Sequence, residues 1–360
     1  MRRILLDYLK EGMIVGRTIH NKKGEELLKE GVALDKDYID LLAKSNISYV
    51  IVDDGIPFQV PEAADVISKQ TRTMAVRQIK KVLLEAKESG RLLVEPQALY
   101  GTVGEFIRQL LASRDVIYNL VDMRLMDDYL FAHSVNVCVL SVMTGITMGY
   151  DSSDLELLGI GALLHDLGKV KLPDKILNKP SPLDEDEWET VKMHPVFGYD
   201  IISQAGNMDE TVAIIALQHH EHFDGSGYPQ GIPDGQITEF SQIVAIADKF
   251  DAITADRSHR KAFPPVEAYE LCEASLNYYV KESVARAFIY NVAAYPANTV
   301  VELNNGMIGV TTKTYKGNSL FPLVKVYCDK DKKAMATPIQ IPLYKNEGLR
   351  IVKVLQDPYG

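Results

Sequence analysis

Seven side chains of metal-ligating type, five histidines and two aspartates, recur through the middle of the sequence. They are His133, His165, Asp166, His194, His219, His220 and Asp248. Imidazole and carboxylate ligands favour divalent ions of borderline softness, such as iron or manganese, and do not suit a thiolate-bound structural zinc. Two such ions about 3.5–4 Å apart are the usual arrangement for phosphoester hydrolysis. The residue types therefore predict two-metal phosphoester chemistry.

The strongest signals are adjacent pairs that end apolar segments. His165 and Asp166 follow LELLGIGALL, and His219 and His220 follow TVAIIALQ. A carboxylate after so apolar a run needs a partner, because burying an unpaired carboxylate is expensive. A cation held by the neighbouring side chains supplies that partner, whereas the plainer alternative is a single His–Asp hydrogen bond.

The other candidates are weaker when each is taken alone. His133 and His194 are singly more typical of core or surface histidines, and they gain weight only beside the two pairs. Asp248 lies in the apolar segment SQIVAIADKFDAITAD, and Asp251 follows on roughly the same helical face. We assign Asp248 as the ligand and Asp251 as a supporting carboxylate. Cys138 is expected to pack in the core rather than bind a metal.

Helices must position these side chains, because residues 96–295 have a helical pattern almost throughout. Ser152 or Ser153 is a natural N-cap for LELLGIGALL, and Gly168 lets the chain leave that helix. Lys169 follows directly, where its ammonium group is placed to bind a phosphate; the alternative is a solvated helix end.

The flanking segments have other patterns. Residues 1–61 mix strands with one short helix and predict a small α+β module, which we expect to be a regulatory or interaction module. Residues 62–95 predict a linker helix. It is either a plain amphipathic surface helix, a signalling linker or a helix that forms a dimer. Residues 296–360 switch to alternating strands, with Asn305-Gly306 as a hairpin turn.

Composition limits the class of partner. The chain has 360 residues and a formal net charge of −10, so no broad basic surface for duplex nucleic acid is expected. Three cysteines far apart are typical of a reducing, cytoplasmic compartment. No secretory signal is evident. The apolar stretch 135–150 is interrupted by polar residues and too short to span a bilayer, so we expect no membrane anchor.

The motifs that carry these residues resemble those of the HD-GYP family, a branch of the HD metal-dependent phosphohydrolases. HDLGK at His165, MHPVFG at Met193, HHEHFDGSGYP at His219 and ADKFDAITADRSHR at Ala247 occur in family order. The resemblance is dense from about residue 127 to residue 260. It implies a mainly α fold, an HD-type helical bundle as catalytic domain, flanked here by the small α+β module and a β-rich C-terminal segment.

The resemblance also implies an activity, hydrolysis of the second messenger cyclic di-GMP to pGpG, GMP or both. It implies one metal held by His133, His165, Asp166 and Asp248. It implies a second metal held by Asp166, as a bridge, with His194, His219 and His220. Asp166 and Lys169 then act in catalysis, and the groups that bind substrate phosphates are Lys169, Arg257 and Arg260.

One position bears on the number of metals. Some family members place a glutamate four residues before the first histidine, where it binds a third ion. The residue here is Tyr129, which is a poor ligand for such a site. We therefore predict two divalent ions, iron or manganese.

The GYP loop, Gly225–Pro229, has two interpretations. Its residues Gly225, Gly227, Tyr228 and Pro229 shape the rim of the pocket, which we favour, or the loop docks diguanylate cyclase domains, as proposed for the family. Asp224 belongs to the same loop, and Glu221 is expected to orient a histidine.

Two other functions stay open. The same ligands serve a phosphohydrolase of another cyclic dinucleotide or nucleotide, because they determine the reaction type and leave the base undetermined. A cyclic-dinucleotide-binding signalling module would be expected to have a broken ligand set, whereas this sequence has a full one. A homodimer is also compatible with the sequence.

Overall fold

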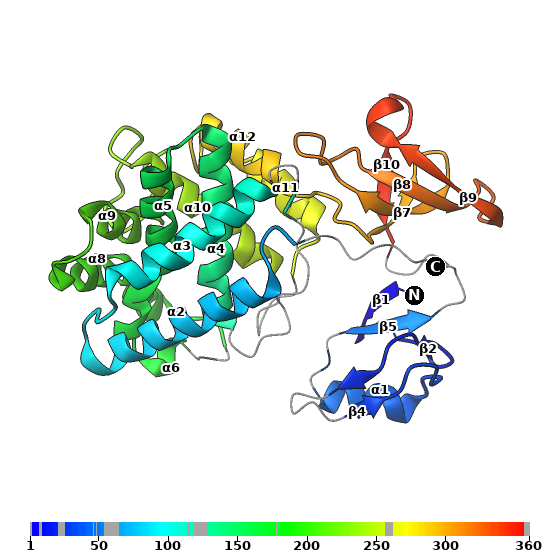
Figure 1. Ribbon diagram of the computed structural model, residues 1–360, viewed down its shortest axis with the longest axis horizontal. Helices are drawn as coiled ribbons and strands as arrows, with labels where there is room; N and C mark the ends of the chain where they lie inside the picture. The colour runs from blue at the N-terminus through cyan, green and yellow to red at the C-terminus, as the bar shows by residue number, and fades with distance from the viewer. Residues whose placement is uncertain are drawn as a thin grey trace. The chain divides into compact units, whose positions relative to one another are not determined.

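The computed structural model describes residues 2–6, 9–20, 26–45, 47, 49–53, 65–113, 116–118, 129–177, 179, 181–255 and 262–355. The chain divides into two compact units (Figure 1). One comprises residues 64–295 with 315–320 and is helical. The other comprises the remaining N-terminal and C-terminal segments and contains the described strands.

The helical unit is a bundle built around α4. Its elements are α2 (Lys69–Ser89), α3 (Pro96–Ala112), α4 (Tyr129–Met148), α5 (Ser152–Leu164), η3 (Leu167–Lys171), α6 (Asp174–Leu177), α7 (Glu185–Val191), α8 (His194–Ala205), α9 (Glu210–Gln218), α10 (Glu239–Thr254), α11 (Pro265–Glu273) and α12 (Glu282–Asn291). One continuous apolar core joins these elements apart from α6 and α7. The mainly α fold class is confirmed, with the HD-type bundle expected from the sequence.

The central helix α4 is apolar on nearly all sides. The window Phe131–Met148 has a mean hydropathy of 1.4 and is by length and composition able to cross a membrane, but 78% of it is buried inside the bundle. A helix that is apolar all round is typical of a bundle core. Our expectation that this stretch is too short to span a bilayer was wrong, since the helix extends to Tyr129; it is burial that accounts for its apolar character.

Helix α5 delivers the His165–Asp166 pair. Its N-cap is Asp151, whose carboxylate accepts a hydrogen bond from the amide of Asp154 at 3.0 Å, so the predicted cap was one or two residues too late. Asp151 is the N-cap because its carboxylate reaches the amide three residues later, and because the positive end of the helix dipole stabilises a negative charge there. The helix ends at Leu164, which places His165 at the C-cap and Asp166 at the start of η3.

The predicted linker helix is part of the bundle. Helix α2 buries Ala75, Val76, Ile79 and Val82 in the same apolar core as α4. The alternation of apolar and charged residues that suggested a connecting helix instead reflects one buried face and one solvated face.

The N-terminal module is α+β, as predicted. Its strands are β1 (Arg2–Leu5), β2 (Ile14–Val15), β3 (Ile19–His20), β4 (Glu26–Leu28) and β5 (Tyr49–Asp53). They form an antiparallel sheet of order β1-β5-β2 and a β3-β4 pair, with one helix, α1 (Lys36–Lys44), capped by Asp35. Leu42, Val50 and Val52 lie in a separate apolar core.

The C-terminal segment is a five-stranded antiparallel sheet of order β10-β6-β7-β8-β9. Its strands are β6 (Val300–Leu303), β7 (Ile308–Lys313), β8 (Leu323–Cys328), β9 (Ala334–Pro342) and β10 (Ile351–Val354), with the short η4 (Leu343–Lys345) after β9. The hairpin at Asn305-Gly306 is confirmed, and Gly306 has a φ of +86°. Strand β9 contains Pro338 and lies at the edge of the sheet, where proline is tolerated.

One glycine sets how closely α8 can approach the HD motif. A Cβ built on Gly168 would lie 1.9 Å from the carbonyl oxygen of His194 and 2.4 Å from the amide nitrogen of Gly198. Both atoms belong to the backbone and cannot rotate away. The close contact between η3 and α8 that brings His194 to Asp166 therefore requires glycine at position 168.

We expect Gly168→Ala to lower the free energy of unfolding by roughly 1–3 kcal/mol or more, because a methyl group must displace backbone. The matched control is Gly104→Ala in α3, where an added Cβ meets nothing within 4 Å. That change is expected to stabilise by about 0.5–1 kcal/mol through helix propensity. Urea unfolding of both variants measures the difference, and equal effects would contradict the close-approach argument.

Candidate metal centre

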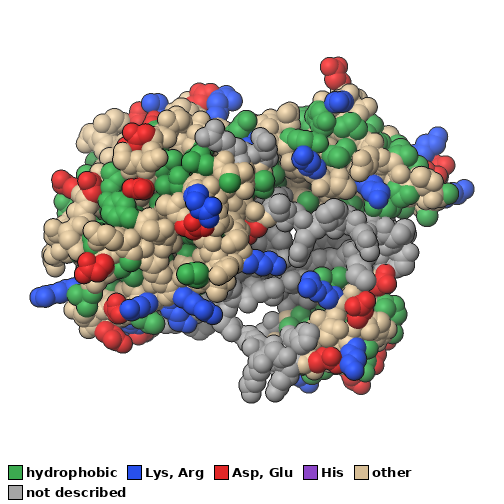
Figure 2. Space-filling view, viewed as in Figure 1, with side chains coloured by type: hydrophobic (Ala, Val, Ile, Leu, Met, Phe, Trp, Pro, Cys, Tyr) green, Lys and Arg blue, Asp and Glu red, His purple; other side chains and the backbone are tan. Residues whose placement is uncertain are grey.

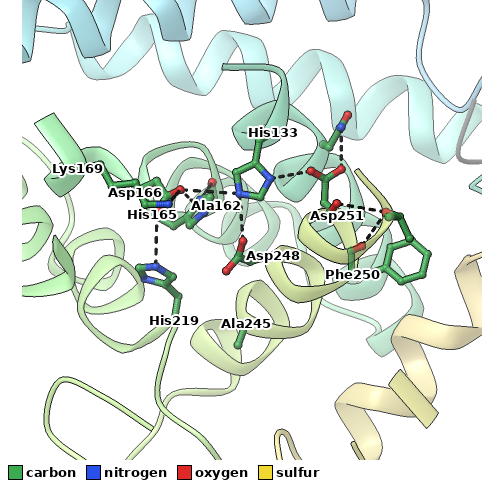
Figure 3. A network of polar contacts seen from close by, with 12 residues as sticks. His133, Ala162, His165, Asp166, Lys169, His219, Ala245, Asp248, Phe250 and Asp251 are labelled. Carbon is green, nitrogen blue, oxygen red and sulfur yellow. Dashed lines mark hydrogen bonds and ion pairs between the residues drawn. The ribbon is translucent and has the colours of Figure 1, made fainter. Parts of the chain in front are cut away.

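The seven predicted ligand residues form two adjacent groups in the helical unit. One group is His133, His165 and Asp248, and the other is Asp166, His194, His219 and His220. Within each group one ligand atom per residue lies within 4.8 Å of the others. Figure 3 shows His133, His165, Asp166 and Asp248 directed toward one another from helices far apart in the sequence.

The carboxylate of Asp166 faces both groups. Its Oδ2 lies 3.4 Å from Nε2 of His165 and 3.8 Å from Nε2 of His133. Its Oδ1 lies 3.4 Å from Nε2 of His194 and 3.8 Å from Nε2 of His219. One oxygen therefore serves each group, which is the geometry of a bridging carboxylate.

Hydrogen bonds at the far side of the rings determine which nitrogen each histidine offers. The Nδ1 atoms of His165, His194 and His219 lie 2.8, 2.7 and 2.8 Å from the carbonyl oxygens of Ala162, Val191 and Ala216. A carbonyl oxygen only accepts, so Nδ1 carries the proton and Nε2 is left with a free lone pair. All three Nε2 atoms point into the site.

Several of these Nε2 atoms face other hydrogen-bond acceptors, with no donor between them. Nε2 of His194 lies 3.3 Å from Nε2 of His219, and the buried atoms Nε2 of His165 and Oδ1 of Asp166 have no hydrogen-bond partner among the described residues. Buried acceptors that face one another are costly unless something positive lies between them. A cation in each group satisfies these atoms, so the residues fit two divalent ions, with a shared carboxylate.

Burial also sets the protonation state that the histidines and Asp166 need in order to bind a metal. In the metal-free protein burial, together with the nearby charge of Lys169, lowers the pKa of His194 to about 4. Burial likewise lowers the pKa of His220 to about 3, although Asp248 opposes it, and the pKa of His219 well below its usual range. Burial alone would raise the pKa of Asp166, but Lys169 and His165 outweigh it and lower that pKa. Neutral imidazoles and an ionised carboxylate result.

Lys169 is beside the shared carboxylate, with Nζ 2.5 Å from Oδ2 of Asp166. A third of its side chain is exposed, so the ammonium group lies between the buried ligands and solvent. This is the position from which a cation can meet the phosphate of a ligand at the metals, as the sequence predicted.

His133 differs from the other ligands because a carboxylate orients it. Its Nδ1 lies 2.7 Å from Oδ2 of Asp251, and its Nε2 lies 3.1 Å from Oδ1 of Asp248 (Figure 3). Burial would lower the pKa of His133, but hydrogen bonds to Asp248 and Asp251 raise it to about 10. Asp248 therefore faces the site and Asp251 lies behind the ring, the arrangement assigned from the sequence.

A buried hydrogen-bond chain extends from Asp251 to helix α2. Asn136 donates from Nδ2 to Oδ1 of Asp251 at 2.8 Å and accepts at Oδ1 from Nη1 of Arg72 at 3.0 Å. Arg72 also donates from Nη2 to both oxygens of Asp65 at 2.9 and 3.1 Å. Sequence reasoning missed Asn136 and Arg72. The available signal for Asn136 was its position three residues after His133, on the same side of α4.

The GYP loop closes over the second group. Tyr228 stacks on His220, with ring centroids 4.7 Å apart and 23° between the planes, and its amide donates to the carbonyl of His220 at 3.0 Å. Gly227 fits because an added Cβ would lie 2.4–2.5 Å from backbone atoms of residues 220–222. The peptide before Pro229 is cis. Asp224 accepts from the amide of Ser226 at 2.9 Å, and Gly225 has a φ of +80°.

Glu221 was predicted to orient a histidine, and this was wrong. Its buried carboxylate accepts hydrogen bonds from the amides of Gln230 at 2.7 Å and Ile232 at 3.2 Å. It therefore holds the end of the GYP loop. Helix carbonyls, and not Glu221, accept from Nδ1 of His165, His194 and His219.

The remaining candidate residues are not part of the two ligand groups as the structure describes them. Arg257 and Arg260 are outside the described residues, and so is the side chain of Tyr129. Cys138 is fully buried in the apolar core, where burial raises the pKa of its thiol, and it is in neither ligand group.

Comparison with known families decides the type of domain. Residues 115–280 match the family model described as HD domain, and this span contains all seven ligand residues. This part of the chain is therefore an HD domain. The helical fold and the two groups of histidine and aspartate ligands agree with that match.

Three relatives of this chain are informative. A Pseudomonas aeruginosa protein named cyclic di-GMP phosphodiesterase PA4108 is 34% identical over 225 residues, 62% of this chain and 54% of that protein. The Xanthomonas campestris cyclic di-GMP phosphodiesterase response regulator RpfG is 42% identical over 32% of this chain and 31% of its own length. A Vibrio cholerae 3'3'-cGAMP-specific phosphodiesterase 3 is 36% identical over 41% and 32%. The matches thus span 31–54% of these relatives.

Asp251→Asn is expected to lower the affinity for one of the two metals by roughly 10–100-fold, because the amide no longer fixes the charge and tautomer of His133. Asn136→Ala should have a smaller effect in the same direction. Competition between the protein and a fluorescent chelator for Mn²⁺ measures both. The control is Asp151→Asn, where asparagine is an equally good helix cap, and unchanged affinity in all three variants would contradict the orienting role.

The metal-free protein is expected to lose stability as pH falls from about 6.5 toward 4. Unfolded histidines titrate near 6.5, whereas the pKa values of folded His194 and His220 are about 4 and about 3. The unfolded chain therefore binds more protons in this window, and acid favours unfolding. His133, whose pKa is raised, keeps its full contribution below pH 6.5. Calorimetric Tm values should fall with pH, and His220→Gln should flatten the slope; a Tm that rises would contradict this.

Proposed function

We propose that this chain is a metal-dependent phosphodiesterase that hydrolyses cyclic di-GMP to pGpG, GMP or both. The observation that carries the proposal is the carboxylate of Asp166, which presents one oxygen to each histidine group. Relatives that are 32–42% identical to part of this chain bear the name cyclic di-GMP phosphodiesterase, which supports the substrate.

The residues divide the work. Two bound divalent ions supply an activated water and stabilise the charge that develops on the phosphodiester. His133, His165 and Asp248 would hold one ion, and His194, His219 and His220 the other, with Asp166 shared. Lys169 binds a phosphate oxygen beside Asp166 and neutralises part of the charge of the ligand. Arg257 and Arg260 are proposed to grip further phosphate oxygens.

We propose iron or manganese as the native metal, because imidazole and carboxylate ligands without thiolate suit these ions. The position four residues before His133 is Tyr129, so we propose two ions per chain and no third.

A specific observation favours one alternative substrate. Vibrio cholerae proteins named 3'3'-cGAMP-specific phosphodiesterases are 32–36% identical to this chain over 41–43% of its length. The ligands would be the same, because both substrates are cyclic dinucleotides with two phosphodiester bonds. Binding without turnover would instead favour a signalling module.

The remaining proposals rest on sequence pattern. We place the chain in a reducing, cytoplasmic compartment without a membrane anchor, consistent with three free buried cysteines. The mixed positive and negative side chains over the helical unit in Figure 2 give no support for a duplex nucleic acid partner on that face. A homodimer and docking of diguanylate cyclase domains at the GYP loop are further proposals.

The test is a product-resolved assay on protein loaded with Fe²⁺ or Mn²⁺ under reducing conditions, with metal content measured on the same sample. We expect pGpG, GMP or both and about two ions per chain. Asp166→Asn and His219→Ala should lower kcat/KM by about 10³-fold or more, because losing the bridge or a ligand removes the metal pair. Competing cyclic di-GMP with 3'3'-cGAMP decides between the substrates.

Lys171→Ala is the matched control for Lys169→Ala. Both lysines lie in η3, but Lys171 is exposed and its Nζ lies near Gly90 at the end of α2, whereas Nζ of Lys169 is at Asp166. Only Lys169→Ala should impair turnover. Two ions per chain with no hydrolysis of either dinucleotide would refute the enzyme, and three tightly bound ions would refute the metal count.

A further inference from the structure

An exposed tryptophan lies next to the GYP loop without a role in the metal centre. Trp188, on the short helix α7, is 46% exposed, and its ring centroid is 6.2 Å from that of Tyr228 at an interplanar angle of 74°. Tyr228 in turn stacks on His220 of the second ligand group. A row of three aromatic rings therefore leads outward from the metals.

Trp188 is held in place by local structure rather than by the apolar core. Asp184 and Glu187 form a reciprocal capping box at the start of α7, with two bonds of 2.9 Å, and Glu187 also pairs with Lys179. No residue of α7 is buried. A large apolar ring kept at a fixed place on a solvated helix is well suited to meet a flat ligand, and little entropy is lost when the ligand binds.

The charges around Trp188 limit what that ligand group can be. Five carboxylates lie in α7 and at its N-cap: Asp184, Glu185, Asp186, Glu187 and Glu189. Two lysines pair with them, Lys179 with Glu187 and Lys192 with Glu189, so the surroundings of Trp188 keep a net negative charge. This charge disfavours a phosphate there, and the phosphate is proposed to lie beside Lys169 at Asp166. The part of a nucleotide that fits Trp188 is therefore the uncharged base. Tyr228 and Trp188, with nearly perpendicular planes, provide a corner with aromatic walls for it.

We propose that Trp188 is a stacking platform for a purine base of the nucleotide whose phosphate lies at the metals. This inference rests on the proposed function and adds to it the group that binds the base. Stacking is tolerant of base identity, since every base has a π face. Trp188 then contributes affinity for purine nucleotides in general, and discrimination between guanine and adenine comes from other groups.

The test uses two phosphate ligands that differ in the base. GMP and ribose 5-phosphate both carry a sugar and a phosphate, and only GMP carries a purine. As inhibitors of the metal-loaded enzyme, GMP should bind roughly 5–100-fold more weakly to Trp188→Ala than to the unaltered protein. Ribose 5-phosphate should bind both equally. In Trp188→Ala the KM for cyclic di-GMP should rise, as the inhibition constant of GMP does, while kcat changes little.

Two matched variants separate stacking from structure. Trp188→Phe keeps an aromatic face and should retain most of the affinity. Leu84→Ala removes a side chain of similar exposure, 47%, from the solvated side of α2, and should change neither inhibitor. Tm values of all variants check that none of them unfolds.

Fluorescence gives a readout that needs no turnover. Trp188 is the only tryptophan in the chain, so indole emission reports on this position alone. GMP should quench it saturably in the full metal-loaded chain, and ribose 5-phosphate should not. Quenching by GMP without hydrolysis of any cyclic dinucleotide would support the platform and refute the proposed function. Hydrolysis with unchanged emission and an unchanged KM in Trp188→Ala would overturn the platform and leave the function standing.

Discussion

The burial of one carboxylate between two sets of imidazoles is the constraint on which the structure depends. Asp166 is 11% exposed and lies within 3.4–3.8 Å of four histidine nitrogens, three of which carry lone pairs toward it. Without cations this arrangement leaves buried acceptors unsatisfied. With two cations every one of these atoms has a partner. The bundle therefore places its most costly polar groups where the metals can satisfy them, and the surrounding apolar core can stay closely packed.

Helix ends make this arrangement possible. His165 and His219 are the C-caps of α5 and α9, where unpaired backbone carbonyls are available to accept from Nδ1. His194 gains its carbonyl in the same way from the turn before α8. The helices end at the ligands, so each imidazole is oriented by groups that the helix leaves unpaired in any case. Gly168 then lets η3 and α8 approach until their ligands meet.

The sequence singled out residues that the structure brings together, because adjacent histidines and acids at the ends of apolar segments are costly to bury unless they share a cation. Asp251, chosen from its spacing to Asp248, lies against Nδ1 of His133. Glu221 was not, because a carboxylate next to two histidines suggests them as partners, whereas the loop that folds back in space provides its amides. Asn136 and Arg72 were missed for a related reason: amides and guanidinium groups have so many uses that only the fold shows which ones are buried together.

The two metal positions are chemically different, and the difference follows from His133. Carbonyl oxygens orient His165, His194 and His219, but an ionisable carboxylate, Asp251, orients His133. Apart from shared Asp166, the group of His133 also includes the carboxylate of Asp248, whereas the other group has only imidazoles. A divalent ion in the first group would therefore meet one carboxylate more than an ion in the second group. Because the chain Asp251–Asn136–Arg72 ties the imidazole of His133 to α2, the group with the additional carboxylate is also the one connected to the start of the helical unit.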